Sequence, residues 1–541
     1  MNHMTTLSDG RPYDPARARI VLAILAGMAM MVTYVETMVL PAFKQFYTFF
    51  DQTGGSFSNV TWILSAYLLV GVVVTPVFGK LGDLYGKRRM LLLAMSIYAI
   101  AVTLAGFTPN IGSALGLSRP NQLYLLIGVR GVQGVGMGMF PIGFAMIPEV
   151  FPPARVGQAQ GIISAMFATG ASLGLVGGGW VAQTFGWQLT YHTVIPAAVL
   201  LVLLAFFLLR ESALHPDRSV DVPGAASLGF ALAMAMMGIT EGASWGWGNL
   251  SAVTYSGVPL GVPQFFLLAA LGTLFFVLWE PRAKNPVVSF AALRQRNLLV
   301  ANVNGVIVGM LMFIVFTSIT ILIEFPYGPG FGQSELTMGL LALPASASML
   351  VLGPILGRAV STYGPKPVML VGFATMALGG FLFVQFNRSL LEMAVMPIPL
   401  MAGNVAVLIA MVNTIVLTAD RREVGAQTGM NQTFRTLGSA IAPVLVATIL
   451  ASFTATYLIP NPYTGGVVPF NGYALEGFQV VFALTGALAV VGFLLTLALR
   501  NYRFHADGSR SGHANAPAPP GTGSPASPRE AWRPTAPHPE E

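Results

Sequence analysis

Residues 199–207 read VLLVLLAFF, a run that is apolar on every side of a helix. A membrane β-strand alternates apolar and polar residues, so this run argues against a β-barrel and for a membrane helix. The composition agrees, because 54% of the 541 residues are hydrophobic and 9% are charged. A soluble domain carries about a quarter charged residues. The sequence therefore predicts an all-α integral membrane protein.

Fourteen apolar runs are long enough to cross a bilayer, which takes about 20 residues of helix. The expected spans are 20–42, 57–79, 90–107, 121–147, 157–181, 190–209, 223–241, 263–280, 298–323, 336–357, 367–386, 393–418, 424–452 and 477–499. They predict an N-terminal tail at 1–19, a six-helix bundle at 20–210, a linker with two extra spans at 211–297, a second six-helix bundle at 298–499, and a tail at 500–541.

The basic residues set the expected orientation. Three of the 28 Lys and Arg residues fall in alternate loops, at Lys44, Arg119 and Arg388, and two lie inside spans, at Arg130 and Arg435. The other 23 fall on the opposite side, which the positive-inside rule assigns to the cytoplasm. We therefore expect a multi-pass protein of the cytoplasmic membrane with both termini inside, no cleaved signal peptide, and a disordered C-terminal tail rich in Pro, Ala, Gly and Ser.

Two pairs of segments indicate an internal repeat. Residues 79–87, GKLGDLYGK, align with residues 357–365, GRAVSTYGP, and residues 156–161 with Gly170 align with residues 424–429 with Gly438. Both pairs are eight spans apart. Two six-helix halves separated by two extra spans would produce this shift, and parallel repeats of that kind form transporters with a site between the halves.

Three motifs carry a family resemblance. Residues 79–89, GKLGDLYGKRR, resemble the loop signature of the major facilitator superfamily, and residues 130–136, RGVQGVG, look like its fourth-helix motif. Residues 170–180, GASLGLVGGGW, with Gly186 and Trp187, are similar to the fifth-helix motif of drug:proton antiporters, although Leu175 stands where that motif has proline. With fourteen spans, the resemblance is to the fourteen-helix drug:proton antiporter family and covers about residues 20 to 500.

This resemblance implies a major facilitator-like fold of two six-helix bundles plus two linker spans. It also implies antiport of lipophilic or cationic drugs, driven by a proton gradient with no bound cofactor and no metal. We expect a monomer whose partners are a small-molecule substrate, protons and membrane lipids, and no nucleic acid. The alternatives are an exporter dedicated to one lipid or metabolite, an uptake symporter, and a non-transporting membrane sensor.

An enzyme is not expected. The chain has no cysteine, five of its six histidines lie in tails or a loop, and it contains no phosphate-binding GxxxxGK[ST] loop. These residues leave no convincing nucleophile, metal cluster or ATP-driven mechanism.

Proton coupling needs a group inside the membrane that can take up and release a proton, and apolar surroundings disfavour its charged form. Glu36 follows an uncharged run from residue 20 and is the candidate, with a headgroup-level carboxylate as the alternative. Arg130 is the only charge in residues 121–147 and is its expected companion, with a purely structural hydrogen-bonding role as the alternative.

The remaining candidates form three groups. A cytoplasmic gate, or a plain topology signal, is expected from Gly79, Asp83, Gly86, Lys87, Arg88, Arg89, Glu149 and Arg155. Close helix packing, with or without a transport role, is expected at Gly170, Gly174, Gly178 and Gly179. Substrate-pathway candidates are Gln133, Asn431, Gln432, Arg435, Glu241 and Glu324. The alternative for Asn431, Gln432 and Arg435 is that they only tie helices together, and the alternative for Glu241 and Glu324 is that they are interface residues at span ends, where a carboxylate can stay hydrated.

Overall fold

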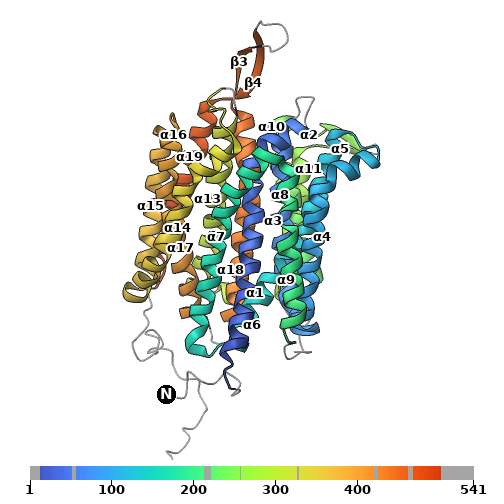
Figure 1. Cartoon of the computed structure of the whole chain (residues 1–541). Coiled ribbons are helices and arrows are strands. Elements are labelled where there is room, and N and C mark those ends of the chain that lie inside the picture. Colours follow the sequence, from blue (N-terminus) through green and yellow to red (C-terminus); the bar gives the residue numbers. More distant parts are fainter. Residues whose placement is uncertain are drawn as a thin grey trace, which may run out of the picture.

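A computed structural model describes residues 12–50, 57–211, 221–255, 258–284, 286–325, 328–419, 424–460 and 467–500. Long helices run side by side along one axis, and a β-hairpin projects from one end (Figure 1). We call that end the hairpin end, and the opposite end, where the first long helix begins at Pro15, the N-terminal end. The tail expected to be disordered, from residue 501 onward, lies outside the described residues.

The N-terminal half contains α1 (Pro15–Met38), η2 (Leu40–Ala42), α2 (Phe43–Phe50), α3 (Phe57–Tyr85), α4 (Lys87–Ala114), α5 (Arg119–Gly134), η3 (Val135–Gly138), α6 (Met139–Val150), α7 (Pro153–Phe185), α8 (Trp187–His192) and α9 (Ile195–Leu208). The linker carries α10 (Val222–Trp245), β1 (Val253–Tyr255), β2 (Val258–Leu260), α11 (Val262–Trp279), η4 (Glu280–Arg282) and α12 (Phe290–Leu293).

The C-terminal half contains α13 (Arg296–Glu324), α14 (Glu335–Tyr363), α15 (Pro365–Gln385), α16 (Leu390–Val395), α17 (Pro397–Thr418), α18 (Val424–Ser452), β3 (Thr454–Pro460), β4 (Val467–Tyr473) and α19 (Leu475–Leu497). Among the described residues, 13 helical segments are long and apolar enough to cross a membrane. The remaining expected span, 157–181, lies within the long helix α7. The predicted membrane-helix architecture is therefore confirmed.

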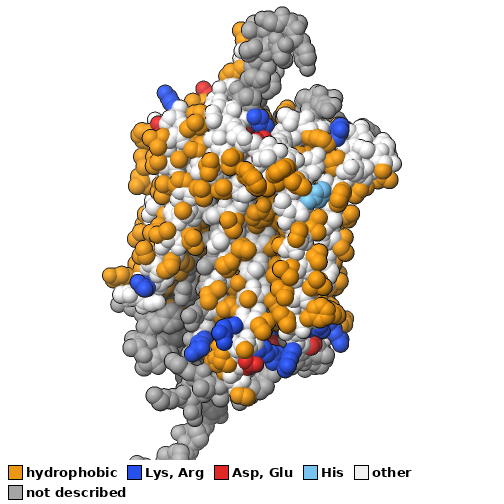
Figure 2. Space-filling view, viewed as in Figure 1, with side chains coloured by type: hydrophobic (Ala, Val, Ile, Leu, Met, Phe, Trp, Pro, Cys, Tyr) orange, Lys and Arg blue, Asp and Glu red, His pale blue; other side chains and the backbone are white. Residues whose placement is uncertain are grey.

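The surface of the bundle matches this architecture. Hydrophobic side chains cover the flank, while Lys and Arg gather at the N-terminal end (Figure 2). Many leucine and phenylalanine side chains of the spans, such as Phe207 and Leu271, are exposed rather than buried. A helix whose outer face is apolar is stable only where lipid replaces water.

Equivalent helices pack in equivalent ways in the two halves. In the N-terminal half α1 packs along α7, and in the C-terminal half α13 packs along α18. A side chain at Gly170 of α7 would collide with the Met30 carbonyl of α1, and one at Gly438 of α18 would collide with the Val306 carbonyl of α13. The glycines matched by the sequence repeat therefore perform the same packing role twice.

Two helix pairs join the halves. Helix α3 packs along α18, and α7 packs along α14. The linker helix α10 covers the first of these seams, because the Trp62 indole donates to Thr240 at 3.1 Å and the Thr448 hydroxyl donates to the Ile239 carbonyl at 3.0 Å. The two extra spans are thus a hairpin laid over one seam between the halves.

The hairpin of β3 and β4 was not predicted from the sequence. Its strands are antiparallel, with Tyr457 opposite Phe470. Both strands alternate or mix apolar and polar residues over only seven positions, so they lack the length that marks a membrane span. The helical fold therefore carries two short β-hairpins outside its spans, β1–β2 and β3–β4.

The contact between α7 and α1 gives a test of the glycine packing. We expect Gly170→Ala to destabilise the protein by about 1–3 kcal/mol, because its Cβ meets backbone that cannot move aside. Gly177→Ala is the matched control, because its Cβ would lie 3.5 Å from the Tyr34 ring, an ordinary contact. Thermal unfolding followed by size-exclusion chromatography measures both, and equal melting temperatures would contradict this account.

Candidate functional site

Tyr67 connects the two side chains expected to couple protons. Its hydroxyl donates to Oε1 of Glu36 at 3.2 Å. Its ring lies under the Arg130 guanidinium, with 4.6 Å between Cζ and the ring centroid. Glu36 comes from α1, Tyr67 from α3 and Arg130 from α5, so three helices meet at this point.

Arg130 is fully buried and is held without an ion pair to a carboxylate, and two of its three guanidinium nitrogens have hydrogen-bond partners among the described residues. Its Nε donates to the Ile63 carbonyl at 3.0 Å, and its Nη1 donates to Oε1 of Gln133 at 2.7 Å. The Tyr191 ring lies 5.8 Å from Cζ on another side. Backbone carbonyls and aromatic faces stabilise a guanidinium where water is absent. This arrangement fits the expected structural role and also places a fixed positive charge near Glu36.

Glycines allow the helix that carries Arg130 to come this close. A side chain at Gly134 would collide with the Tyr67 carbonyl, and one at Gly136 would meet the Tyr98 ring. The chain tightens into the 3-10 turn η3 directly after these contacts begin. The glycine-rich fourth-helix motif is therefore the reason that α5 can lie against α3 and α4.

The C-terminal half contributes a second guanidinium. Arg435 of α18 donates from Nη2 to Oε1 of Gln432 at 2.6 Å and interacts electrostatically with Glu36. Both Glu36 and Arg435 keep some solvent-accessible area, although they lie deep in their helices. The carboxylate therefore interacts electrostatically with one arginine from each half, Arg130 and Arg435.

Asn431 contacts the neighbouring helix α13 rather than Arg435. Its amide nitrogen donates to the Ala301 carbonyl at 3.0 Å, and Asn302 lies beside it. These contacts tie α18 to α13 one turn from Arg435. Asn431 thus holds two helices together, and Gln432 is the hydrogen-bond partner of Arg435.

The fifth-helix glycines face two different helices. Gly170, Gly174 and Gly178 abut α1, and the Thr37 hydroxyl of α1 donates to the Ala171 carbonyl at 3.0 Å. Gly179 instead abuts the backbone at Glu335 of α14, across the seam between the halves. The motif therefore packs one helix inside its own half and one helix of the other half.

Part of the expected gate is an ion-pair cluster at the N-terminal end. Lys87 pairs with Glu149, lies 3.9 Å from Oδ1 of Asp83, and donates to the Ala145 carbonyl at 3.3 Å. The contact joins the start of α4 to the end of α6. Gly79 and Gly82 pack against residues of α6 at Pro141 and Ile142.

The rest of the gate candidates lie in separate contacts. The Arg88 and Arg89 amides donate to Glu211 at 2.9 and 3.2 Å, so Glu211 caps the start of α4. Gly86 has φ +105°, and a side chain there would meet the Glu211 carboxylate. Arg155 is exposed and contacts Tyr13, with 5.4 Å between its Cζ and the ring centroid.

The two carboxylates expected at hydrated span ends differ. Glu241 is half-buried on the linker helix α10. Glu324 is fully buried at the end of α13, so the expectation that it stays hydrated is wrong. The reason is that α2 and α14, from distant parts of the chain, meet over the end of α13.

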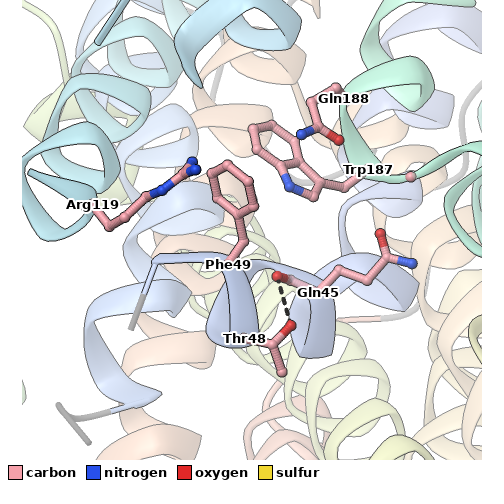
Figure 3. Close-up of a pocket in the computed structure, with 7 residues that line it drawn as sticks. Gln45, Thr48, Phe49, Arg119, Trp187 and Gln188 are labelled. Carbon is pink, nitrogen blue, oxygen red and sulfur yellow. Dashed lines mark hydrogen bonds between the residues drawn. The ribbon is translucent and has the colours of Figure 1, made fainter. Parts of the chain in front are cut away.

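A shallow depression of about 330 Å³ lies at the hairpin end. Gln45, Thr48 and Phe49 of α2 form its floor, with Arg119, Trp187 and Gln188 around it (Figure 3). The Arg119 guanidinium lies over the Phe49 ring at 4.1 Å. This depression is separate from the Glu36 cluster.

Sequence reasoning missed the aromatic residues of the site. Tyr67, Tyr98 and Tyr191 are fully buried around Arg130, and no motif contains them. Tyrosine is an ordinary residue in membrane helices, so composition gave no signal. The available signal was physical: a lone intramembrane arginine requires partners, and buried aromatic residues are among the few candidates.

With this geometry in view, comparison with known proteins shows the class. The family profile of the Major Facilitator Superfamily matches residues 23–443 and again 305–537, so the chain belongs to this superfamily of membrane transporters.

Two characterised bacterial relatives are exporters or resistance proteins by name. The tetracenomycin C resistance and export protein of Streptomyces glaucescens is 26% identical over 450 residues, covering 82% of this chain and 77% of the relative. The multidrug resistance protein Stp of Mycobacterium tuberculosis is 22% identical over 452 residues, covering 82% and 78%. The human organic anion transporter MFSD10 (TETRAN) shares the fold, with a TM-score of 0.56 and 15% identity over 89% of this chain and 100% of its own.

Tyr67 offers a test of the site. Tyr67→Phe removes the hydroxyl that donates to Glu36 but keeps the ring beside Arg130. A hydrogen bond to a charged group contributes about 1.5–3 kcal/mol, so we expect transport to fall about tenfold while the amount of folded protein is unchanged. Tyr67→Leu, which also removes the ring, should lower both transport and the amount of folded protein. Transport assays and chromatography measure the two effects, and wild-type transport by Tyr67→Phe would show that the hydroxyl is dispensable.

Proposed function

We propose that this chain is a proton-coupled secondary active exporter of lipophilic or cationic small molecules. The positive-inside rule supports a cytoplasmic membrane location with the N-terminal end in the cytoplasm and the hairpin end outside. The names of the multidrug-resistance and antibiotic-export relatives support the substrate class.

The observation that carries the proposal is that Glu36 interacts electrostatically with two arginines from different halves, Arg130 and Arg435. An ionised Glu36 attracts Arg435 of the C-terminal half, whereas a protonated Glu36 does not. Protonation therefore changes an interaction between the halves. A bound ligand moves a conformational equilibrium only through such a difference in contacts between states.

The same carboxylate supports antiport. A cationic substrate would pair with ionised Glu36, and a proton would remove the charge that holds it. Proton and substrate thus compete for one group. A proton entering from outside would release the substrate there, and proton release inside would restore the binding form.

Arg435 also supports a second candidate function, the proton-coupled uptake of an anion. Arg435 is partly accessible, and an anion bound there would displace the Glu36 carboxylate and favour its protonation. Proton and anion would then bind together, which is symport. The direction of substrate movement in a proton gradient separates the two functions.

Sealed everted vesicles with an acidic lumen test the proposal. We expect wild-type protein to accumulate a lipophilic cation such as ethidium in the lumen, and Glu36→Gln to lose this accumulation, because the variant cannot exchange a proton. Glu476→Gln is the matched control, since Glu476 is an exposed carboxylate on the first turn of α19.

Two results would contradict this function. Gradient-driven accumulation by Glu36→Gln at the wild-type level would remove Glu36 from proton coupling. Movement of an anionic substrate with the proton gradient, and none of a cation against it, would favour uptake symport.

A further inference from the structure

Among the described residues of the hairpin end, Glu324 is the most deeply buried carboxyl group. It is 0% exposed at the last residue of α13, and neither of its oxygens has a hydrogen-bond partner among the described residues. The backbone N–H of Lys44 interacts with the carboxyl group without meeting the geometry of a hydrogen bond. A buried carboxylate without hydrogen bonds or a close ion pair is strongly disfavoured.

The groups that face Glu324 come from both halves. Lys44 of α2 and Glu335 of α14 interact with it electrostatically, and neither forms an ion pair with it in the described part of the chain. Tyr47 and Tyr473 pack on Phe325, the next residue. Glu335 disfavours a negative charge on Glu324 and Lys44 favours one, so the two effects oppose each other.

Glu335 is held in a different way. It lies in the first turn of α14, where the helix dipole favours a negative charge. It also accepts a hydrogen bond from Nε2 of Gln45 at 3.1 Å, and the same Gln45 amide donates to the Ala182 carbonyl at 2.7 Å. Glu335 therefore has a polar partner that Glu324 lacks, and of the two carboxyls Glu324 is the one whose charge the packed arrangement leaves without a hydrogen bond.

We propose that Glu324 is a proton-binding latch for the hairpin end of the transporter. With a proton on Glu324, the contacts among α2, α13 and α14 close. When these helices separate, water reaches the carboxyl group. The group then loses its proton at a pH near the ordinary pKa of a hydrated glutamate, which is about 4.3. Reclosing then requires Glu324 to take up a proton from the hairpin side.

This latch differs from the coupling site. Its proton enters and leaves on the same side, so it changes the closing equilibrium without adding to the number of protons transported. It requires only that the hairpin end opens and closes. If Glu36 were not the coupling group, the Glu324 latch would therefore still be possible. If the latch did not exist, the proposed function would be unaffected.

The chain contains no cysteine, so two introduced cysteines can be labelled without background. Phe185→Cys on α7 and Leu391→Cys on α16 place spin labels on opposite halves at the hairpin end, at side chains that are 57% and 73% exposed. Double electron–electron resonance on the purified protein in lipid nanodiscs, without substrate, then measures the separation from about pH 4.5 to 8.5.

We expect the short separation to dominate at acid pH and a longer one to grow as the pH rises. For one linked proton the ratio of open to closed populations changes about tenfold per pH unit. Glu324→Gln should keep the short separation at every pH, because its side chain is neutral throughout. Glu324→Asp should restore the pH dependence, and Glu476→Gln should match the wild type.

The same measurement in Glu36→Gln shows which carboxyl group causes the pH dependence of the separation. Persistence of the pH dependence in Glu36→Gln, together with its loss in Glu324→Gln, supports the latch. A wild-type separation that does not change with pH would overturn it. So would an unchanged pH dependence in Glu324→Gln, including the case in which only Glu36→Gln removes the response.

Discussion

A charged side chain far from water must find its partners within the protein, because lipid offers none. Arg130 shows how many elements this requirement fixes: the Ile63 carbonyl, the Gln133 amide and the faces of Tyr67 and Tyr191 all converge on one guanidinium. Helices α3, α5 and α8 must hold their relative positions for these contacts to exist. Glu36 joins the same arrangement through Tyr67. The geometry of the central site therefore follows from the contacts that hold the Arg130 guanidinium.

Close helix contact is the second requirement, and glycine meets it at matching positions in both halves. In lipid, helices gain little from hydrophobic association, so backbone approach and packing determine which helices pair. Gly170 and Gly438 place the carbonyl of a neighbouring helix where any side chain would lie. Gly179 does the same between the halves, where it abuts the backbone of Glu335.

Much of this fold could be predicted from the sequence, because hydropathy and loop charge report directly on membrane helices. Glu36 and Arg130 could also be selected, since charge is scarce in the spans. The Tyr67 bridge could not, because it depends on how α1, α3 and α5 are rotated about their axes, and the spans are too uniformly apolar to show this. The burial of Glu324 was missed because local sequence places it at a span end, whereas α2 and α14 cover it in three dimensions.

The hairpin of α10 and α11 makes the two flanks of the transporter unequal. Its contacts through Trp62 and Thr448 lie on the seam of α3 and α18, and the seam of α7 and α14 is built from glycine-mediated backbone contact instead. Relative movement of the halves would therefore displace the contacts of α10 on one flank in addition to the contacts between the halves themselves. The halves repeat the same packing, yet the two flanks of the bundle differ in what holds them together.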